Sequence, residues 1–174
     1  MNRELQHRLQ AELGRPGLAW KSSPRHESQE QTTMRWLPVA NPPAARIELG
    51  ISSDAWWVVP APQSVTELRP DTPCVFLLPV LEVTLDEARR SLAQGLRAIG
   101  LTTEYLAVFP FDDVVATGLE SSSERWAGLA LKWAEQLPTS SRLQNALRSL
   151  ISHGPTQKLR HAAQKLLARQ RGST

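Results

Sequence analysis

The hydrophobic pattern changes along the chain, from short runs typical of strands to longer periodic segments typical of helices. Between residues 34 and 109, apolar residues gather in short runs separated by turns that contain proline or glycine. From residue 121 onward they recur at intervals of three and four residues, which is the period of an amphipathic helix. This change predicts an α/β (α+β) body followed by a helical C-terminal unit.

The middle of the chain predicts a strand, a helix and a second strand. An apolar run at 74–83 is followed by an amphipathic segment at 85–99 and a second apolar run at 105–109. Thr84 and the glutamate three residues later form a capping box, and Gly100 is suited to cap the other end of the helix. Because a helix of this length can join two parallel strands, we expect a small mixed sheet with one β-α-β crossover.

Further short strands are predicted before this crossover. Residues 34–39 are typical of an edge strand, since Pro38 has no N–H to donate to a neighbouring strand. Residues 46–51 alternate between apolar and polar side chains, and a short turn separates them from a second strand at 55–59. These two strands are expected to form a hairpin.

The predicted elements divide the chain into four segments. They are an N-terminal helix at 1–14, a flexible linker at 15–33, an α/β body at 34–118 and a basic helical C-terminal unit at 119–174. Three periodic apolar stripes in the last segment, the first capped by Ser121, predict three helices. Short connections between them predict consecutive antiparallel neighbours.

Ionic side chains are distributed unevenly. The chain has 20 basic and 17 acidic residues, for a net charge of +3. From residue 136 to the end there are no acidic residues, and the basic residues there are Arg142, Arg148, Lys158, Arg160, Lys165, Arg169 and Arg171. An acidic body with a basic end predicts a partner that carries negative charge.

A binding surface is predicted on the C-terminal helices. On a helical wheel Lys158, Lys165 and Arg169 fall on one narrow face, with His161 adjacent. A ridge of cations without acids is typical of surfaces that contact phosphates or carboxylates. The alternatives are a solvated face, or a helix docked on acidic residues of the same chain. The predicted binding residues on these helices are Arg142, Lys158, Arg160, His161, Lys165 and Arg169.

The tryptophans are the second candidate for a binding surface. The chain contains six, of which Trp56 and Trp57 are adjacent on a predicted strand. Neighbouring residues of a strand face opposite sides, so we expect at least one of the two to be available for a partner or a stacked base. The alternative is that both pack in the core.

One pair of short motifs resembles a nuclease family. The sequences Pro70-Asp71 and Leu81-Glu82-Val83, in the order helix, strands, helix and strand, resemble the PD-(D/E)xK nuclease superfamily. The resemblance implies that Asp71 and Glu82 hold a divalent metal ion that activates water. Thr84 stands where that family has a lysine.

No P-loop, GxGxxG, CxxC, HExxH or GxSxG motif is present, so we expect no enzymatic activity, no cofactor and no metal.

The remaining signals concern the cellular setting. Cys74 is the only cysteine, so no intramolecular disulfide forms and we expect a buried apolar side chain. No apolar run is long enough for a membrane span, and the N-terminal residues lack the apolar core of a signal peptide, so a cytoplasmic location is expected. The predicted function is non-enzymatic binding of another macromolecule, first of all a protein, through aromatic surface and the basic C-terminal helices. The alternatives are nucleic-acid binding through the same basic helices, and a metal-dependent nuclease or a degenerate relative of one.

Overall fold

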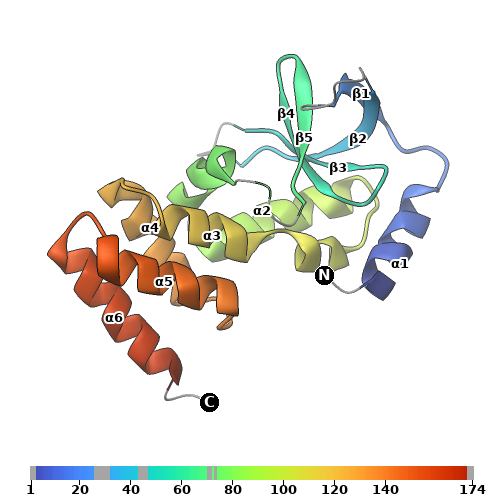
Figure 1. Ribbon diagram of the computed structural model, residues 1–174. Helices are drawn as coiled ribbons and strands as arrows, with labels where there is room; N and C mark the ends of the chain where they lie inside the picture. Colours follow the sequence, from blue (N-terminus) through green and yellow to red (C-terminus); the bar gives the residue numbers. More distant parts are fainter. Residues whose placement is uncertain (1–2, 26–31, 43–46, 70–71, 73, 172–174) are drawn as a thin grey trace. The chain divides into compact units, whose positions relative to one another are not determined.

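The computed structural model describes residues 3–25, 32–42, 47–69, 72 and 74–171 (Figure 1). These residues form one sheet, α-helices and 3-10 helices, which confirms the predicted combination of α and β structure with a helical C-terminal part. The chain makes two compact units. Unit 1 comprises Met1–Thr72 and Asp86–Phe109, and unit 2 comprises Pro73–Leu85 and Pro110–Thr174. Each unit is therefore discontinuous in sequence, unlike the predicted segments 34–118 and 119–174.

Unit 1 is built on an antiparallel meander in which each strand pairs with the next along the chain. The strands are β1 (Lys21–Pro24), β2 (Thr33–Ala40), β3 (Leu49–Ser52), β4 (Trp57–Ala61) and β5 (Ser64–Glu67). The predicted hairpin is confirmed, because β3 and β4 pair with Ile51 opposite Trp57. A parallel bridge between Arg25 and Val65 joins the ends of the meander, so the sheet curls until its first and last strands meet.

Two predictions about these strands are corrected. β2 is an inner strand, paired with both β1 and β3, although it contains Pro38. A register shift between Pro38 and Ala40 accommodates the missing N–H. β1 lies within the segment predicted as a flexible linker, and its side chains are mostly exposed. Its pairing comes from main-chain hydrogen bonds, which leave no apolar pattern in the sequence.

Helix α2 (Leu85–Ala98) packs directly on the sheet of unit 1. It has the predicted bounds to within one residue, and Gly100, at φ 75°, follows it in the left-handed conformation expected of a C-terminal cap. Gly95 lies against β2 so closely that a Cβ atom there would stand 2.0 Å from the carbonyl oxygen of Val39. A glycine is therefore required for this helix to reach the strand.

The predicted β-α-β crossover is wrong. The two apolar runs expected to be parallel strands are the 3-10 helices η1 (Val75–Glu82) and η2 (Thr103–Val108), and the sheet is antiparallel rather than mixed. Pro79 lies inside η1 and could not donate to a neighbouring strand. A short apolar run has no periodicity that separates a buried strand from a buried helical segment, so tertiary packing decided between them.

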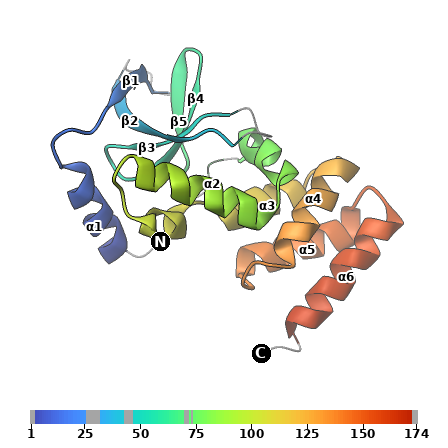
Figure 2. The same cartoon turned by 180° about the vertical axis from the view of Figure 1, so that it is seen from behind.

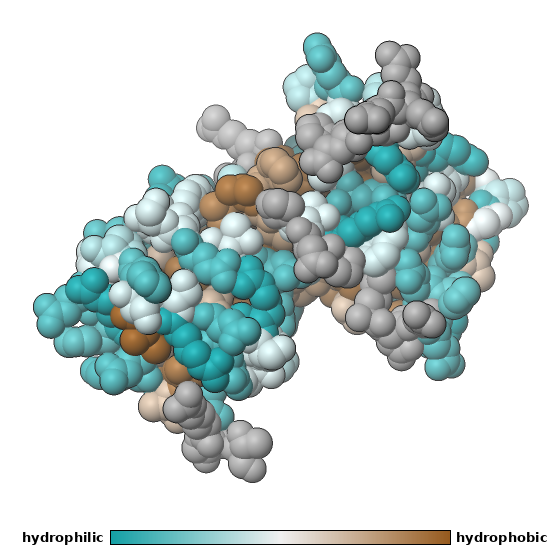
Figure 3. Space-filling model, in the orientation of Figure 1, coloured by the Kyte–Doolittle hydropathy of each residue, from teal (hydrophilic) through white to brown (hydrophobic). Residues whose placement is uncertain are grey.

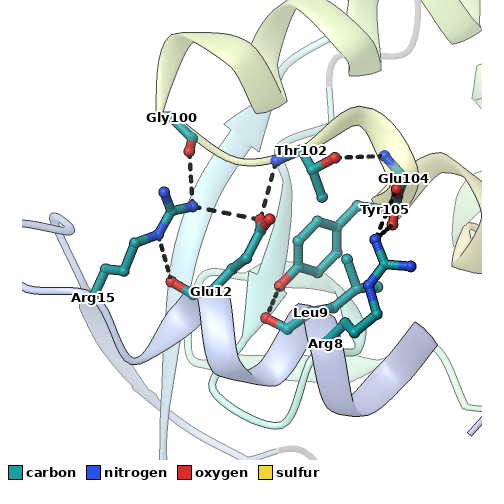
Figure 4. Close-up of polar contacts among 8 residues, drawn as sticks. All are labelled: Arg8, Leu9, Glu12, Arg15, Gly100, Thr102, Glu104 and Tyr105. Atoms are coloured by element: carbon teal, nitrogen blue, oxygen red, sulfur yellow. Dashed lines mark hydrogen bonds and ion pairs between the residues drawn. The ribbon is translucent and has the colours of Figure 1, made fainter. Parts of the chain in front are cut away.

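Helix α1 (Arg3–Leu13) is held on η2 by polar contacts (Figure 4). The Arg8 guanidinium donates to both carboxylate oxygens of Glu104, at 2.9 and 2.7 Å. The buried Tyr105 hydroxyl donates to the main-chain oxygen of Leu9 at 2.5 Å, and burial raises the pKa of this hydroxyl. The predicted N-terminal helix is thus confirmed and is an integral part of unit 1.

Unit 2 is helical, and its elements are best followed in Figures 1 and 2. They are η1, α3 (Phe111–Leu119), α4 (Glu124–Ala134), α5 (Ser141–His153) and α6 (Gln157–Arg171). Helix α3 packs against η1, α4 and α5, while α6 packs against α5 and α4. Because α4 and α5 both pack on α3, the three predicted helices do not form a simple consecutive stack.

The start of α4 differs slightly from its prediction. The side chain of Ser123, rather than that of Ser121, accepts a hydrogen bond from the N–H of Trp126. Ser121 instead accepts one from the N–H of Ser123. Both serines therefore stabilise the first turn, and the helix begins at Glu124. Within the described ranges, no helix combines the length and the apolar character that crossing a membrane requires.

Candidate functional site

Helix α6 brings four of the predicted binding residues together on one exposed face. The hydroxyl of Thr156 accepts a hydrogen bond from the N–H of Leu159 at the start of the helix. The buried side of the helix consists of Leu159, Ala163, Leu166 and Leu167. The exposed side carries the α6 basic face, which we define as Lys158, His161, Lys165 and Arg169. The helical period explains why the sequence alone located this face.

The charges of the α6 basic face are only partly compensated by acids of the same chain. Arg169 lies 3.4 Å from Glu135, and both side chains are exposed, so this pair contributes little stability. Lys158, His161 and Lys165 make no ion pair with the residues that the structure describes. Most of the positive charge on this face is therefore available to another molecule.

The arrangement of these cations does not favour the stability of the helix. Lys158 is the second residue of α6, where the positive end of the helix dipole favours acids over bases. Lys165 and Arg169 are four residues apart on the same helix, a spacing at which like charges destabilise it by about 0.2–0.5 kcal/mol. A negatively charged partner would relieve both effects.

Two other predicted binding residues have structural roles in unit 2. Arg142 donates to both carboxylate oxygens of Glu120, at 2.5 and 2.9 Å, and lies 3.7 Å from Asp113. The hydrogen bonds to Glu120 raise the pKa of Arg142. Arg160 is half-buried and donates to the main-chain oxygen of Gly154 at 3.1 Å. Neither residue belongs to the α6 basic face.

The two adjacent tryptophans have different environments, and β4 begins only at Trp57. Trp57 is 1% exposed, its indole N–H donates to the main-chain oxygen of Tyr105 at 3.0 Å, and its ring meets Phe109 edge-on with centroids 5.1 Å apart. Trp56 is half-buried, with the guanidinium of Arg69 5.8 Å from its ring centre. Trp57 therefore belongs to the core, and only Trp56 is accessible to a partner.

Half-buried tryptophans in the described part of the chain lie beneath arginine side chains. Besides Trp56 with Arg69, these pairs are Trp20 with Arg35 at 4.8 Å and Trp126 with Arg125 at 5.2 Å. Such cation–π contacts shield part of the indole ring from water while the charge stays exposed. Two of the pairs join residues far apart in sequence, so no sequence signal could have identified them.

The residues of the nuclease-like motif do not have the expected setting. Asp71 lies outside the described residues. Glu82 lies at the end of η1, not on a strand, and its carboxylate accepts a hydrogen bond from Arg125 at 2.6 Å. Among the described residues, no three His, Cys, Asp or Glu side chains come close enough to hold a metal ion. The geometry therefore gives the nuclease interpretation no support.

Cys74 is buried in unit 2 and is not in a disulfide. Burial is the main cause that raises the pKa of its thiol to about 12, and the charge of Asp113 adds to the effect. At neutral pH the side chain is a protonated, apolar group, unsuited to act as a nucleophile.

We predict that Cys74 makes the protein less stable in alkali. An unfolded cysteine ionises near pH 8.5, whereas the folded thiol stays protonated until about pH 12. The contribution of the protonated thiol to stability is therefore fully present below about pH 8 and is lost as the pH rises, by roughly 2 kcal/mol at pH 10. Urea denaturation at pH 8 and pH 10 measures this loss. Cys74→Ala should reduce it, and an unchanged loss in that variant would contradict the prediction.

No family model, curated protein or solved structure matches this chain. The fold and surfaces define a mixed α/β protein of two units, the second of which carries an exposed basic helical face.

Proposed function

We propose that this is a non-enzymatic binding protein that uses the α6 basic face to bind an acidic surface of another protein. The observation that supports the proposal is the set of exposed cations on α6. Lys158, His161 and Lys165 have no acidic partner among the described residues, whereas Arg142 in the same unit is fully paired with Glu120. The chain thus compensates some of its C-terminal cations and leaves others exposed on one face.

The distribution of charge between the units supports the same proposal. Unit 2 contains nine basic and six acidic residues, and unit 1 contains eleven of each. The whole net charge of +3 is therefore carried by unit 2, and unit 1 is neutral, not acidic as the order of charges along the sequence had suggested. Complementary charge accelerates the encounter of two proteins and aligns their surfaces.

The size of the basic face favours a protein over a nucleic acid. If three cations of α6 each neutralised one phosphate, the logarithm of duplex affinity would fall with the logarithm of salt concentration with a slope of only about −3. Proteins that rely on phosphate contacts often make about 6–10 of them. A few carboxylates on a protein surface match a face of this size more closely.

The proposal predicts that reversing charge on α6 abolishes binding to acidic polymers. In the Lys158→Glu/Lys165→Glu variant we expect affinity for polyglutamate to fall by about tenfold or more, because attraction becomes repulsion. The matched control is Arg90→Glu/Arg97→Glu on α2, which changes two exposed cations at the same spacing. Fluorescence anisotropy with polyglutamate and with short duplex DNA, between about 50 and 200 mM salt, measures both affinities.

The outcomes separate the alternatives. Binding of polyglutamate that depends on Lys158 and Lys165 supports a protein partner. If only the duplex binds, and its binding depends on Lys158 and Lys165, the partner is a nucleic acid instead of a protein. If neither polymer binds at the lower salt concentration, or if both double variants lose affinity equally, the α6 basic face is not a binding surface.

A further inference from the structure

A small cavity in unit 1 has lining residues typical of a site for anions. It has a volume of about 290 Å³ and lies beside the C-terminal end of α1, where it is lined by Gln10, Leu13, Arg15, Trp20, Arg35 and Ser53. None of its lining residues is acidic. The depression in unit 2 that contains Glu82, Glu124, Arg125 and Lys132 differs, because its acids and bases compensate one another.

Arg35 presents the exposed cation of this cavity. It lies on β2 opposite Ser22 of β1, and Trp20, just before β1, is a diagonal neighbour across the two strands. The guanidinium carbon of Arg35 is 4.8 Å from the centre of the Trp20 ring. Arg35 makes no ion pair within the described ranges. The indole thus supports the guanidinium, while its N–H groups remain available to an oxyanion.

Arg15 is the second cation of the cavity, and its position is fixed (Figure 4). Its Nε donates to the main-chain oxygen of Glu12 at 3.1 Å, and its Nη2 donates to the main-chain oxygen of Gly100 at 3.0 Å. The Glu12 carboxylate, 3.4 Å from Nη2, also accepts a hydrogen bond from the N–H of Thr102. These contacts leave Nη1 of Arg15 without a hydrogen-bond partner among the described residues.

We propose that this cavity binds a small organic oxyanion with a flat apolar part, such as an aromatic carboxylate or a phosphate monoester. Arg35 contacts the oxyanion, with Nη1 of Arg15 as a second donor, and the polar groups of Gln10 and Ser53 complete its hydrogen bonding. The apolar part contacts Leu13 and Trp20. The cavity is at the small end of ligand sites, which are typically about 300–1,000 Å³, so a ligand with one ring and one acid group fits its size.

The test uses the full chain and three probes of similar shape: benzoate, phenyl phosphate and benzylamine. The readout is the indole N–H resonance of Trp20 in a two-dimensional NMR spectrum, assigned with the Trp20→Phe variant. We expect a saturable shift in the millimolar range with at least one of the anions and none with the cationic benzylamine. The anion that binds identifies the ligand as a carboxylate or a phosphate ester.

Arg35→Gln is expected to weaken this binding by about tenfold or more, since a charge-assisted hydrogen bond is lost. The matched control, Arg97→Gln, removes an exposed arginine of α2 that does not line the cavity and should leave the affinity unchanged. Arg35→Lys keeps the positive charge but lacks the planar guanidinium, so this variant should bind the anion with intermediate affinity. That result would show that Arg35→Gln weakens anion binding rather than folding. The Lys158→Glu/Lys165→Glu variant should bind as the original chain does, so the test is independent of α6.

Three results would each overturn the proposal. They are the absence of a saturable shift with both anions, an equal shift with benzylamine, and an unchanged affinity in Arg35→Gln.

Discussion

Replacing Trp57 by alanine is expected to lower the free energy of unfolding by about 3–5 kcal/mol. The side chain is 1% exposed and meets Phe109 edge-on, so its removal leaves a large cavity. The main-chain oxygen of Tyr105 also loses the indole N–H that donates to it at 3.0 Å. A buried acceptor without a partner adds to the cost of the cavity.

Trp56 provides the matched control, since it is the same residue type and immediately precedes Trp57, the first residue of β4. It is half-buried and contacts Arg69 at the surface, so water can replace the lost ring. We expect Trp56→Ala to cost about 1 kcal/mol or less. Urea denaturation, with the midpoint compared at constant slope, measures both values. Equal losses in the two variants would show that Trp57 is not the core residue of this pair.

Gly95→Ala is expected to destabilise the protein by about 2–3 kcal/mol, although helix propensity alone predicts the opposite. Alanine in a helix interior is favoured over glycine by about 1 kcal/mol. At Gly95, however, the added Cβ would lie 2.0 Å from the carbonyl oxygen and 2.8 Å from the carbonyl carbon of Val39. These are main-chain atoms of β2, so α2 and the strand would have to separate.

The control for this prediction is Gly128→Ala in α4. The nearest atom to an added Cβ there is Cδ2 of Leu159, at the ordinary contact distance of 3.9 Å. Helix propensity should therefore dominate, and the free energy of unfolding of this variant should rise by about 0.5–1 kcal/mol. Thermal and urea unfolding measure the change in stability of each variant, and the two changes should have opposite signs. A stabilised Gly95→Ala protein would mean that α2 does not approach β2 as closely as described.

The predicted binding residues show how far sequence reasoning extends. Lys158, His161, Lys165 and Arg169 were placed on one face by helical period alone, because their relative directions depend only on the helix that carries them. Arg142 carries the same charge and follows a similar pattern, yet it is paired with Glu120 from a different element. Whether a cation is compensated depends on which elements pack together, and periodicity contains no such information.

The structural predictions were right where local sequence determines the structure and wrong where packing between distant segments determines it. The N-terminal helix, the helix at 85–98 and the three helices after residue 121 were predicted nearly as observed, since stripes, caps and terminating residues act within a few residues of one another. The strand β1 and the 3-10 helices η1 and η2 were not predicted from the sequence. Each contains few residues, and main-chain pairing or burial by distant segments determines its conformation.

Local hydrogen bonding and hydrophobic period were thus sufficient to define the helices, the β3–β4 hairpin and the basic face of the last helix. Tertiary structure alone decided that Trp57 is buried and Trp56 is not, and that Arg35 meets Trp20 beside a small cavity. The physical reason is that a helix satisfies its main-chain groups internally. A strand, an ion pair or a cavity needs partners from elsewhere in the chain, and only the folded structure provides them.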